Sequence, residues 1–321
     1  MLSILIFFFC FPSVVFSISN CKKIDLPLTA VGPESSTFDS WGQGPYTAIS
    51  DGRVVKYNGP GVGYVDYVIT SPFRSKRECD GTNNPELWPK CGRPIGIAFY
   101  FLKNQLFIAD AYRGLLVAGP NERLATQIAT SAEGLPFKFL DGLDVDQLTG
   151  NVYFTDASSV YTLRQFAQAV AANDASGRLL KYDPKTGQVT VLQRGLSGAA
   201  GVAVSLDSSY VLVTEYIANR IQKFWLRGPK ANTSEILVTL EGRPDNIKRT
   251  PAGNFLVAVT IQNASTQTIV ATAVTINGVG NIRQSVSLGP PYDNTSISEV
   301  LKFRHSYYIG SLMADFLGVC N

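Results

Sequence analysis

A repeated alternation of apolar and polar residues is the dominant pattern along the chain. The segment GLDVDQLTGNVYFTD, residues 142–156, has an alternating run, a turn at Leu148-Thr149-Gly150, and a second apolar run that ends at Asp156. Alternation with a period of two predicts a half-buried strand, and turn residues between two such runs predict a hairpin. We therefore expect two antiparallel strands here.

Versions of this hairpin return along the whole chain. Each has a strand, a polar turn and a second strand that ends in a small or acidic residue. The six versions span residues 38–50, 96–110, 142–156, 201–215, 246–259 and 298–311, and four are followed by a further strand, at 52–57, 114–119, 177–183 and 219–225. Six units of about 50 residues, each with material for four strands, predict an all-β fold, a six-bladed β-propeller. A β-sandwich has no reason to repeat at this period.

One segment departs from the strand pattern. In TLRQFAQAVAAND, residues 162–174, the apolar residues Leu163, Phe166, Val170 and Ala171 fall on one helical face. We expect a short helical insertion over the mouth of the central channel, where it acts as a lid over a binding site. A purely structural plug is the alternative.

The composition argues for a folded protein without a nucleic-acid partner. The chain has 321 residues, of which 45% are hydrophobic, with 28 Gly and 17 Pro, so it can bury a large core and make many turns. The net charge is only +3, and no cluster of Lys and Arg is interleaved with aromatic residues. We expect a monomer that binds a small-molecule substrate.

The first residues, MLSILIFFFCFPSVVFSIS, form an apolar run followed by small residues. The run is short for a membrane span, which needs about 20 residues. We interpret residues 1–19 as a secretory signal peptide and residues 20–321 as the propeller, with a retained signal-anchor as the alternative. No later stretch is long and apolar enough to span a bilayer, so we expect no membrane contact after cleavage.

The remaining cysteines are even in number, which in a secreted chain indicates disulfides. Cys79 and Cys91 bracket a Pro- and Asn-rich loop whose ends must lie close together, so we expect them to pair. That leaves Cys21 with Cys320, a bond between the two chain ends that requires a closed ring; the alternative leaves one or both unpaired. Zinc is disfavoured because His305 is the only histidine and no CxxC motif occurs.

Three sequons could carry glycans in the secretory pathway, although roughly two are expected by chance in a chain of this Asn content. They lie at Asn232, Asn263 and Asn294, and we predict that they carry N-glycans. The expected destination is the vacuole or the extracellular space.

Several longer motifs resemble those of the strictosidine synthase-like proteins of plants. They are CGRPIGIAF, PFKFLDGLDVDQLTGNVYFTD, GRLLKYDP, FWLRGPKANTSE and NIKR, and the resemblance extends from about Gly32 to Val319. It implies a six-bladed propeller, a signal peptide, a loop disulfide at Cys79–Cys91 and a ligand site at the channel mouth. The family's namesake enzyme condenses tryptamine with the aldehyde secologanin in a Pictet–Spengler reaction of alkaloid biosynthesis.

The same resemblance implies that Glu299 is the catalytic base. The reaction needs a group that takes a proton from the ammonium of the amine, and burial raises the pKa of a carboxyl toward neutrality for this task. The resemblance also places Phe139, Asp141 and Ile297 in the substrate pocket, at or near positions where the namesake carries Trp, Tyr and His. We therefore expect a cofactor-free condensation of an amine with an aldehyde, with substrates other than the namesake's. A strand-end residue bonded to backbone amides is the structural alternative for Glu299.

A wider resemblance, to calcium-dependent lactonases and esterases with six blades, implies a different site. There a metal is held by acidic and amide side chains from several blades and polarises the scissile carbonyl. Glu34, Asp141 and the pair Asp245 and Asn246 stand at equivalent places in three blades, whereas Ala200 occupies the place of an expected Asn in the fourth. Metal-dependent ester or lactone hydrolysis, with calcium as cofactor, is the alternative function; turn capping would also explain these residues. A secreted binding propeller without catalysis is a second alternative.

Overall fold

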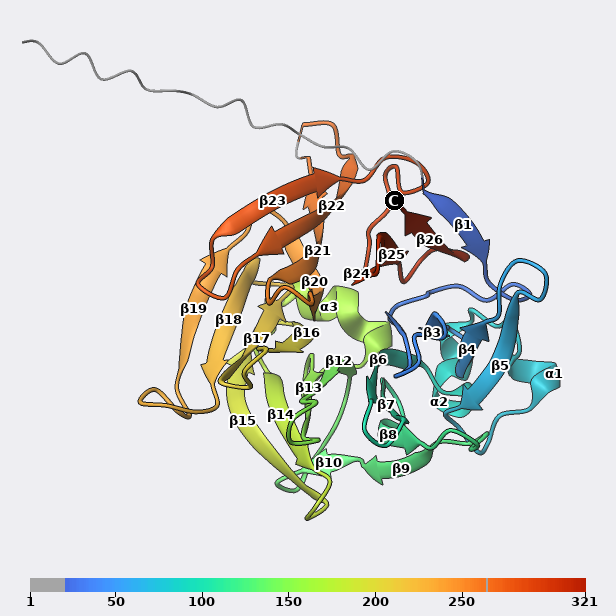
Figure 1. Ribbon diagram of the computed structural model, residues 1–321, viewed down its shortest axis with the longest axis horizontal. Coiled ribbons are helices and arrows are strands. Elements are labelled where there is room, and N and C mark those ends of the chain that lie inside the picture. Colours follow the sequence, from blue (N-terminus) through green and yellow to red (C-terminus); the bar gives the residue numbers. More distant parts are fainter. Residues whose placement is uncertain (1–20, 264) are drawn as a thin grey trace, which may run out of the picture.

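Six four-stranded sheets stand around a central axis in the part of the chain that the computed structural model describes, residues 21–263 and 265–321 (Figure 1). The predicted six-bladed β-propeller is therefore confirmed. The predicted signal peptide, residues 1–19, lies outside the described residues.

The first three blades each run in chain order from the axis to the rim. Blade 1 comprises β2 (Ser36–Thr37), β3 (Tyr46–Ala48), β4 (Arg53–Tyr57) and β5 (Tyr64–Ile69). Blade 2 comprises β6 (Pro94–Tyr100), β7 (Gln105–Asp110), β8 (Gly114–Ala118) and β9 (Thr126–Ala129). Blade 3 comprises β12 (Leu140–Val145), β13 (Val152–Asp156), β14 (Gly177–Asp183) and β15 (Gln188–Leu196). A small hairpin, β10 (Ser131–Ala132) and β11 (Leu135–Pro136), precedes blade 3.

The second half of the ring continues the pattern until the last blade, which is composite. Blade 4 comprises β16 (Ala199–Val204), β17 (Tyr210–Glu215), β18 (Arg220–Trp225) and β19 (Ser234–Thr239). Blade 5 comprises β20 (Arg243–Arg249), β21 (Phe255–Gln262), β22 (Ile269–Ile276) and β23 (Ile282–Ser287). Blade 6 comprises β24 (Glu299–Phe303), β25 (Ser306–Gly310), β26 (Phe316–Cys320) and, from the start of the described chain, β1 (Lys22–Asp25).

The two ends of the described chain close the ring within blade 6. Strand β1 pairs antiparallel with β26, with Lys22 opposite Val319 (Figure 1). A disulfide between Cys21 and Cys320 joins the same two strands. The structure thus contains the predicted bond at the seam of the ring. It also contains the predicted loop disulfide between Cys79 and Cys91.

The inner strands of neighbouring blades approach each other backbone to backbone. A Cβ atom added to Gly96, Gly142 or Gly201 would lie 2.3 to 2.5 Å from a backbone atom of the next inner strand. Only glycine leaves room for this approach. The recurrent glycine of the motifs GIAF, GLDV and GVAV therefore has a packing role.

In two of these three contacts, a threonine of the second strand bonds to the next blade. Thr155 Oγ1 accepts a hydrogen bond from Gly142 N and donates one to Ala200 O. Thr214 Oγ1 repeats the arrangement, since it accepts from Gly201 N and donates to the carbonyl of Asp245 at 2.7 Å. The backbone of Asp245 is therefore held in place by blade 4.

The acidic residues at the ends of the second strands have structural partners. Asp156 pairs with Arg178 at 2.5 Å and accepts a hydrogen bond from the backbone of Phe139. Glu215 pairs with Arg220 at 2.5 Å in the same way. These carboxylates fix the chain that leads into and out of their strands, and they are not available to a ligand.

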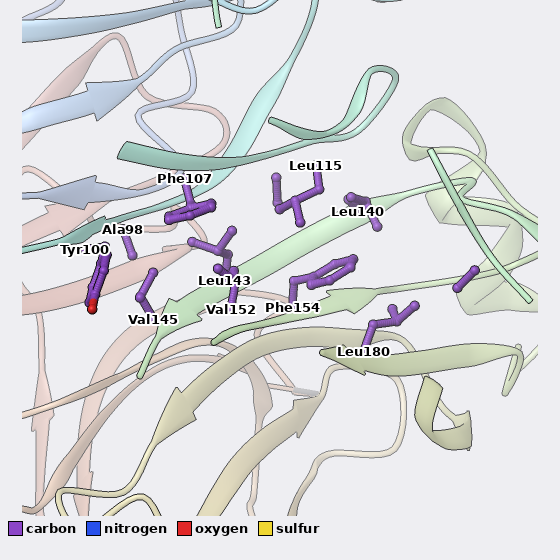
Figure 2. Close-up of a cluster of buried hydrophobic side chains, with 12 residues drawn as sticks. Ala98, Tyr100, Phe107, Leu115, Leu140, Leu143, Val145, Val152, Phe154 and Leu180 are labelled. Carbon is purple, nitrogen blue, oxygen red and sulfur yellow. The ribbon is translucent and has the colours of Figure 1, made fainter. Parts of the chain in front are cut away.

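Apolar side chains fill the space between blades. Figure 2 shows the cluster in which Phe107 and Leu115 of blade 2 pack against Leu143 and Phe154 of blade 3. Full burial of one such side chain contributes about 1.5–3 kcal/mol to folding. Because each blade presents both faces to neighbours, the alternating strands are buried on both sides near the axis.

The helices of the described residues are short and lie outside the blades. They are α1 (Lys76–Cys79), η1 (Pro85–Leu87), α2 (Trp88–Cys91), η2 (Leu163–Gln165) and α3 (Phe166–Ala171). None of these helices has the length and apolar character that a membrane span requires.

The predicted helical insertion at 162–174 is present as η2 followed by α3. Figure 1 shows α3 across the centre of the ring. Leu163 is buried as predicted, but Ala169 is buried in place of Ala171, which is exposed. The first turn is a 3₁₀ helix with three residues per turn, so the buried face is rotated from the one that an α-helical period predicts.

The seam disulfide is expected to stabilise the ring more than the loop disulfide does. The double variant Cys21→Ser/Cys320→Ser opens a bond that spans 299 residues, whereas Cys79→Ser/Cys91→Ser opens one that spans 12. Chain-entropy arguments predict a loss of about 6 kcal/mol in the free energy of unfolding for the first and about 3 kcal/mol for the second. Denaturant unfolding of both variants measures this. A seam variant as stable as the loop variant would contradict it.

Candidate functional site

Three carboxylates from three blades meet near the propeller axis. Glu34 precedes β2, Asp141 lies in β12 and Asp245 lies in β20, and one carboxylate oxygen of each lies within 4.8 Å of the others. We call Glu34, Asp141 and Asp245 the acidic cluster. The structure therefore brings together three of the four residues that the sequence suggested as metal ligands.

Equivalent positions of the inner strands explain why these side chains meet. Asp141, Ala200 and Asp245 each lie in an irregular step of the pairing near the start of an inner strand. An irregular step of this kind is a β-bulge, which changes the direction in which side chains point. Bulges are frequent beside functional sites. Blades 3 and 5 thus contribute an acid at this position, and blade 4 contributes Ala200, as the sequence predicted.

The backbone just before Glu34 makes a tight contact with Arg93. Gly32 has φ +67°, and a Cβ there would lie 2.3 Å from Nη2 of Arg93. Arg93 is fully buried, and its Nη1 donates to the carbonyl oxygens of Gly32 and Pro94. The positive charge of Arg93 acts on Glu34 and lowers its pKa, against the larger effect of burial.

Burial raises the pKa of every member of the acidic cluster. The pKa of Glu34 rises to about 7, chiefly because the charged form loses its water. Burial, and then repulsion from the Glu34 carboxylate, raise the pKa values of Asp141 and Asp245 well above their ordinary values. Asp245 keeps some exposure to solvent. A compensating positive charge at this place would therefore be strongly favoured.

The hydrogen bonding of the cluster is incomplete. Ser298 donates a hydrogen bond to the Glu34 carboxylate, but Glu34 Oε2 is buried and has no partner among the described residues. Asn246, also buried, has no partner for Nδ2 in the described part of the chain. Buried polar atoms are rarely left unpaired. Carboxylate and amide oxygens from several blades are the ligands that a hard cation such as calcium prefers, so the residues present fit a divalent cation.

Glu299 lies beside the cluster and has its own counter-charge. Its side chain is buried, with Oε2 3.0 Å from Lys248 Nζ. Oε1 accepts a hydrogen bond from Ser36 N at 2.6 Å, and Oε2 accepts one from Ser35 Oγ at 2.7 Å. Glu299 therefore connects blade 6 to blade 1 through the two serines and to blade 5 through Lys248.

The other predicted pocket residues differ in their placement. Phe139 is buried below α3, where its ring contacts Phe166 edge-on at 5.7 Å. Phe166 also contacts Tyr216 at 5.2 Å, so α3 packs on blades 3 and 4 at the end of the ring that carries the acids. Ile297 is fully buried in the apolar core of blades 5 and 6, and the structure does not bring it together with the acidic cluster. Packing between blades 5 and 6 explains why an apolar residue stands at position 297.

Lys248 and Arg93 are the charged residues that the sequence interpretation missed. Both fall within the quoted motifs NIKR and CGRPIGIAF. Lys248 is two residues beyond Asn246 on the same strand, so the period-two rule could have placed it on the axis side. A positively charged side chain in an otherwise apolar inner strand indicates that a buried carboxylate lies opposite that side chain.

Comparisons with known proteins extend the resemblance that the sequence suggested. Residues 141–229 match the sequence profile of the family described as strictosidine synthase. The chain is 45% identical to strictosidine synthase-like protein 12 of Arabidopsis thaliana, over 96% of this chain and 92% of that protein. It is 39% identical to strictosidine synthase of Catharanthus roseus, over 93% of this chain and 86% of that protein.

Solved structures with the same fold are far more distant in sequence. A gluconolactonase from Xanthomonas campestris has a TM-score of 0.63 at 13% identity, covering 97% of this chain and 95% of that one. A luciferin-regenerating enzyme has a TM-score of 0.64, also at 13% identity, covering 94% and 95%. At this identity the similarity concerns the propeller fold, whereas the similarity to the plant proteins extends over nearly the whole chain at high identity. The chain belongs to the strictosidine synthase-like family.

Proposed function

We propose that the protein is a metal-dependent hydrolase of esters or lactones, with a calcium-like divalent cation at the acidic cluster. The observation that carries this proposal is the meeting of Glu34, Asp141 and Asp245 within 4.8 Å around a buried carboxylate oxygen that has no partner among the described residues. Four acidic side chains lie close to the axis; among them, Arg93 acts on Glu34 and Lys248 pairs with Glu299. One divalent cation would balance the remaining charge.

The cluster residues have distinct tasks in this proposal. Glu34, Asp141 and Asp245 hold the cation, and Asn246 offers its amide oxygen. When bound, a divalent cation polarises the carbonyl of an ester or lactone and stabilises the charge that develops on its oxygen. Phe139 and Phe166 of α3, whose rings pack together, exclude water from one side of the site.

A carboxylate, and not a histidine, carries out the proton transfer in this reaction. His305 is exposed in the turn at the far end of β24, so it does not reach the site. Water adds to the carbonyl carbon, the bond from that carbon to the alcohol oxygen breaks, and a carboxyl oxygen passes the proton of the water to the departing alkoxide. A lactone follows the same steps and opens to a hydroxy acid.

Cation binding can be tested without a substrate. We expect calcium, titrated calorimetrically into the apoprotein, to bind with a stoichiometry of one. Asp141→Asn and Asp245→Asn should each weaken this binding at least tenfold, because each removes one negative ligand. Asp315→Asn, which alters an exposed acid of blade 6, should bind like the parent. Absence of binding in the parent chain would refute the metal site.

Hydrolysis should depend on the same cation. With phenyl acetate and a δ-lactone as substrates, we expect turnover in the presence of calcium, loss of at least 90% of it after EDTA treatment, and recovery when calcium is returned in excess. Asp141→Asn should remove turnover for both substrates. Full activity after exhaustive chelation would exclude this mechanism.

A second candidate is the amine–aldehyde condensation, with Glu299 as base. It is favoured by the burial of Glu299 next to the acidic cluster and by the close relationship to strictosidine synthase of Catharanthus roseus. The ion pair with Lys248 and the two hydrogen bonds from residues 35 and 36 already occupy both oxygens of this carboxylate. We therefore place this reaction second.

Two variants separate the catalytic role of Glu299 from its structural role. If Glu299 is the base, Glu299→Gln should reduce condensation at least 100-fold in a mass-spectrometric screen of amines and aldehydes. Lys248→Gln breaks the same ion pair but keeps the carboxylate, so it should retain condensation activity. Equal losses in both variants, accompanied by equal losses in thermal stability, would assign Glu299 a purely structural role.

We propose a secretory location for the protein. Two disulfides support it, because such bonds persist in oxidising compartments. The sequons at Asn232, Asn263 and Asn294 are exposed, so all three are accessible to glycosylation. The vacuole and the extracellular space are the destinations we propose.

A further inference from the structure

A pocket of about 350 Å³ opens between blades 4, 5 and 6 at the same end of the ring as the acidic cluster. Its lining is mostly polar and includes Tyr216, Arg243, Thr260, Gln262 and Ser296. We call it the Arg243 pocket. Neither the proposed cation site nor the condensation site accounts for it.

Arg243 lacks the carboxylate partner that three other arginines of the blades have. Arg53, Arg178 and Arg220 each pair with an acid at 2.5 Å. Among the described residues, no carboxylate oxygen lies within 4.0 Å of the half-buried Arg243. Glu241, the acid in the pocket lining, is exposed and forms no such pair. A guanidinium held in this way is suited to bidentate binding of a carboxylate.

Tyr216 orients this guanidinium. The central carbon of the Arg243 guanidinium lies 5.4 Å from the centre of the Tyr216 ring, and the two side chains are in hydrogen-bonding contact. The Tyr216 ring also contacts Phe166 of α3. The cation is therefore held against a rigid aromatic surface, which reduces the entropy lost when it binds an anion.

The pocket adjoins the acidic cluster. Arg243 is two residues before Asp245 on β20, so their Cα atoms lie no more than about 7 Å apart. Tyr216 is also within electrostatic reach of both Asp245 and Glu34. A molecule of a few carbon atoms can therefore span from the guanidinium to the cluster.

We propose that the Arg243 pocket binds a free carboxylate of the substrate while the ester or lactone carbonyl of the same molecule lies at the acidic cluster. The hydroxyl and amide groups of Thr260, Gln262 and Ser296 add hydrogen-bonding sites for substrate hydroxyls. The substrate class is then an ester or lactone of a short dicarboxylic or hydroxylated acid that keeps one ionised carboxylate. The inference rests on the proposed hydrolysis for its kinetic test but not for its binding test.

The kinetic test compares two esters that differ only at the chain end. 4-Nitrophenyl hydrogen glutarate carries a terminal carboxylate where 4-nitrophenyl pentanoate carries a methyl group. We expect wild-type kcat/KM to favour the glutarate ester at least tenfold. Arg243→Gln should remove this preference through a higher KM for the glutarate ester, and Arg243→Lys should keep part of it because the charge remains. The control Arg194→Gln, in the exposed ion pair with Glu133 on the rim, should leave the ratio unchanged.

A binding test separates this inference from the proposed hydrolysis. Calorimetry with glutaramate and pentanamide, in the presence of calcium, measures carboxylate recognition without turnover. If no ester is hydrolysed but glutaramate binds and Arg243→Gln weakens it at least tenfold, the pocket assignment stands and the hydrolase proposal falls. If both esters are hydrolysed with equal kcat/KM, or glutaramate binds no better than pentanamide, the pocket assignment is overturned.

Discussion

The close approach of the inner strands around the axis is the constraint on which the rest of the structure depends. Glycine at 96, 142 and 201 lets the inner strands of blades 2 to 5 contact one another through backbone atoms. The hydroxyls of Thr155 and Thr214 then bond one blade to its neighbour at these places. A ring built in this way has little freedom at its centre. Side chains beside the glycines are therefore fixed in direction, although they come from distant parts of the sequence.

This rigidity holds several buried carboxylates close together near the axis. Their negative charges are accommodated in two different ways. Glu299 is neutralised by Lys248 and surrounded by donors, so its charge is stabilised within the protein. Glu34, Asp141 and Asp245 have no equivalent arrangement, and burial raises the pKa of each. An internally paired carboxylate stabilises structure, whereas an unpaired group of three is a site prepared for a ligand of positive charge. The distinction favours the cluster over Glu299 as the reactive centre.

The sequence predicted those features that depend on periodicity and ring closure. The repeated hairpins were enough to predict six blades, and a closed ring made the pairing of Cys21 with Cys320 reasonable. The same repetition placed Glu34, Asp141 and Asp245 at equivalent positions, which a symmetric ring must bring together. What the sequence could not provide is the direction of individual side chains. Ile297, which precedes β24, is in the core because packing between blades, not the period of two, decides which way it points.

The asymmetry of the ring has a functional consequence. Of the three equivalent bulge positions in blades 3, 4 and 5, only the one in blade 4 carries a residue without a ligand atom, Ala200. The carbonyl oxygen of Ala200 is occupied by Thr155, so blade 4 leaves a cation at the cluster without a ligand from this position. Tyr216 of blade 4 and Arg243 of blade 5 line the pocket in this same sector of the ring. The pocket thus borders the gap that Ala200 leaves at the cluster, so under the proposed function a substrate bound there would complete the coordination of the cation.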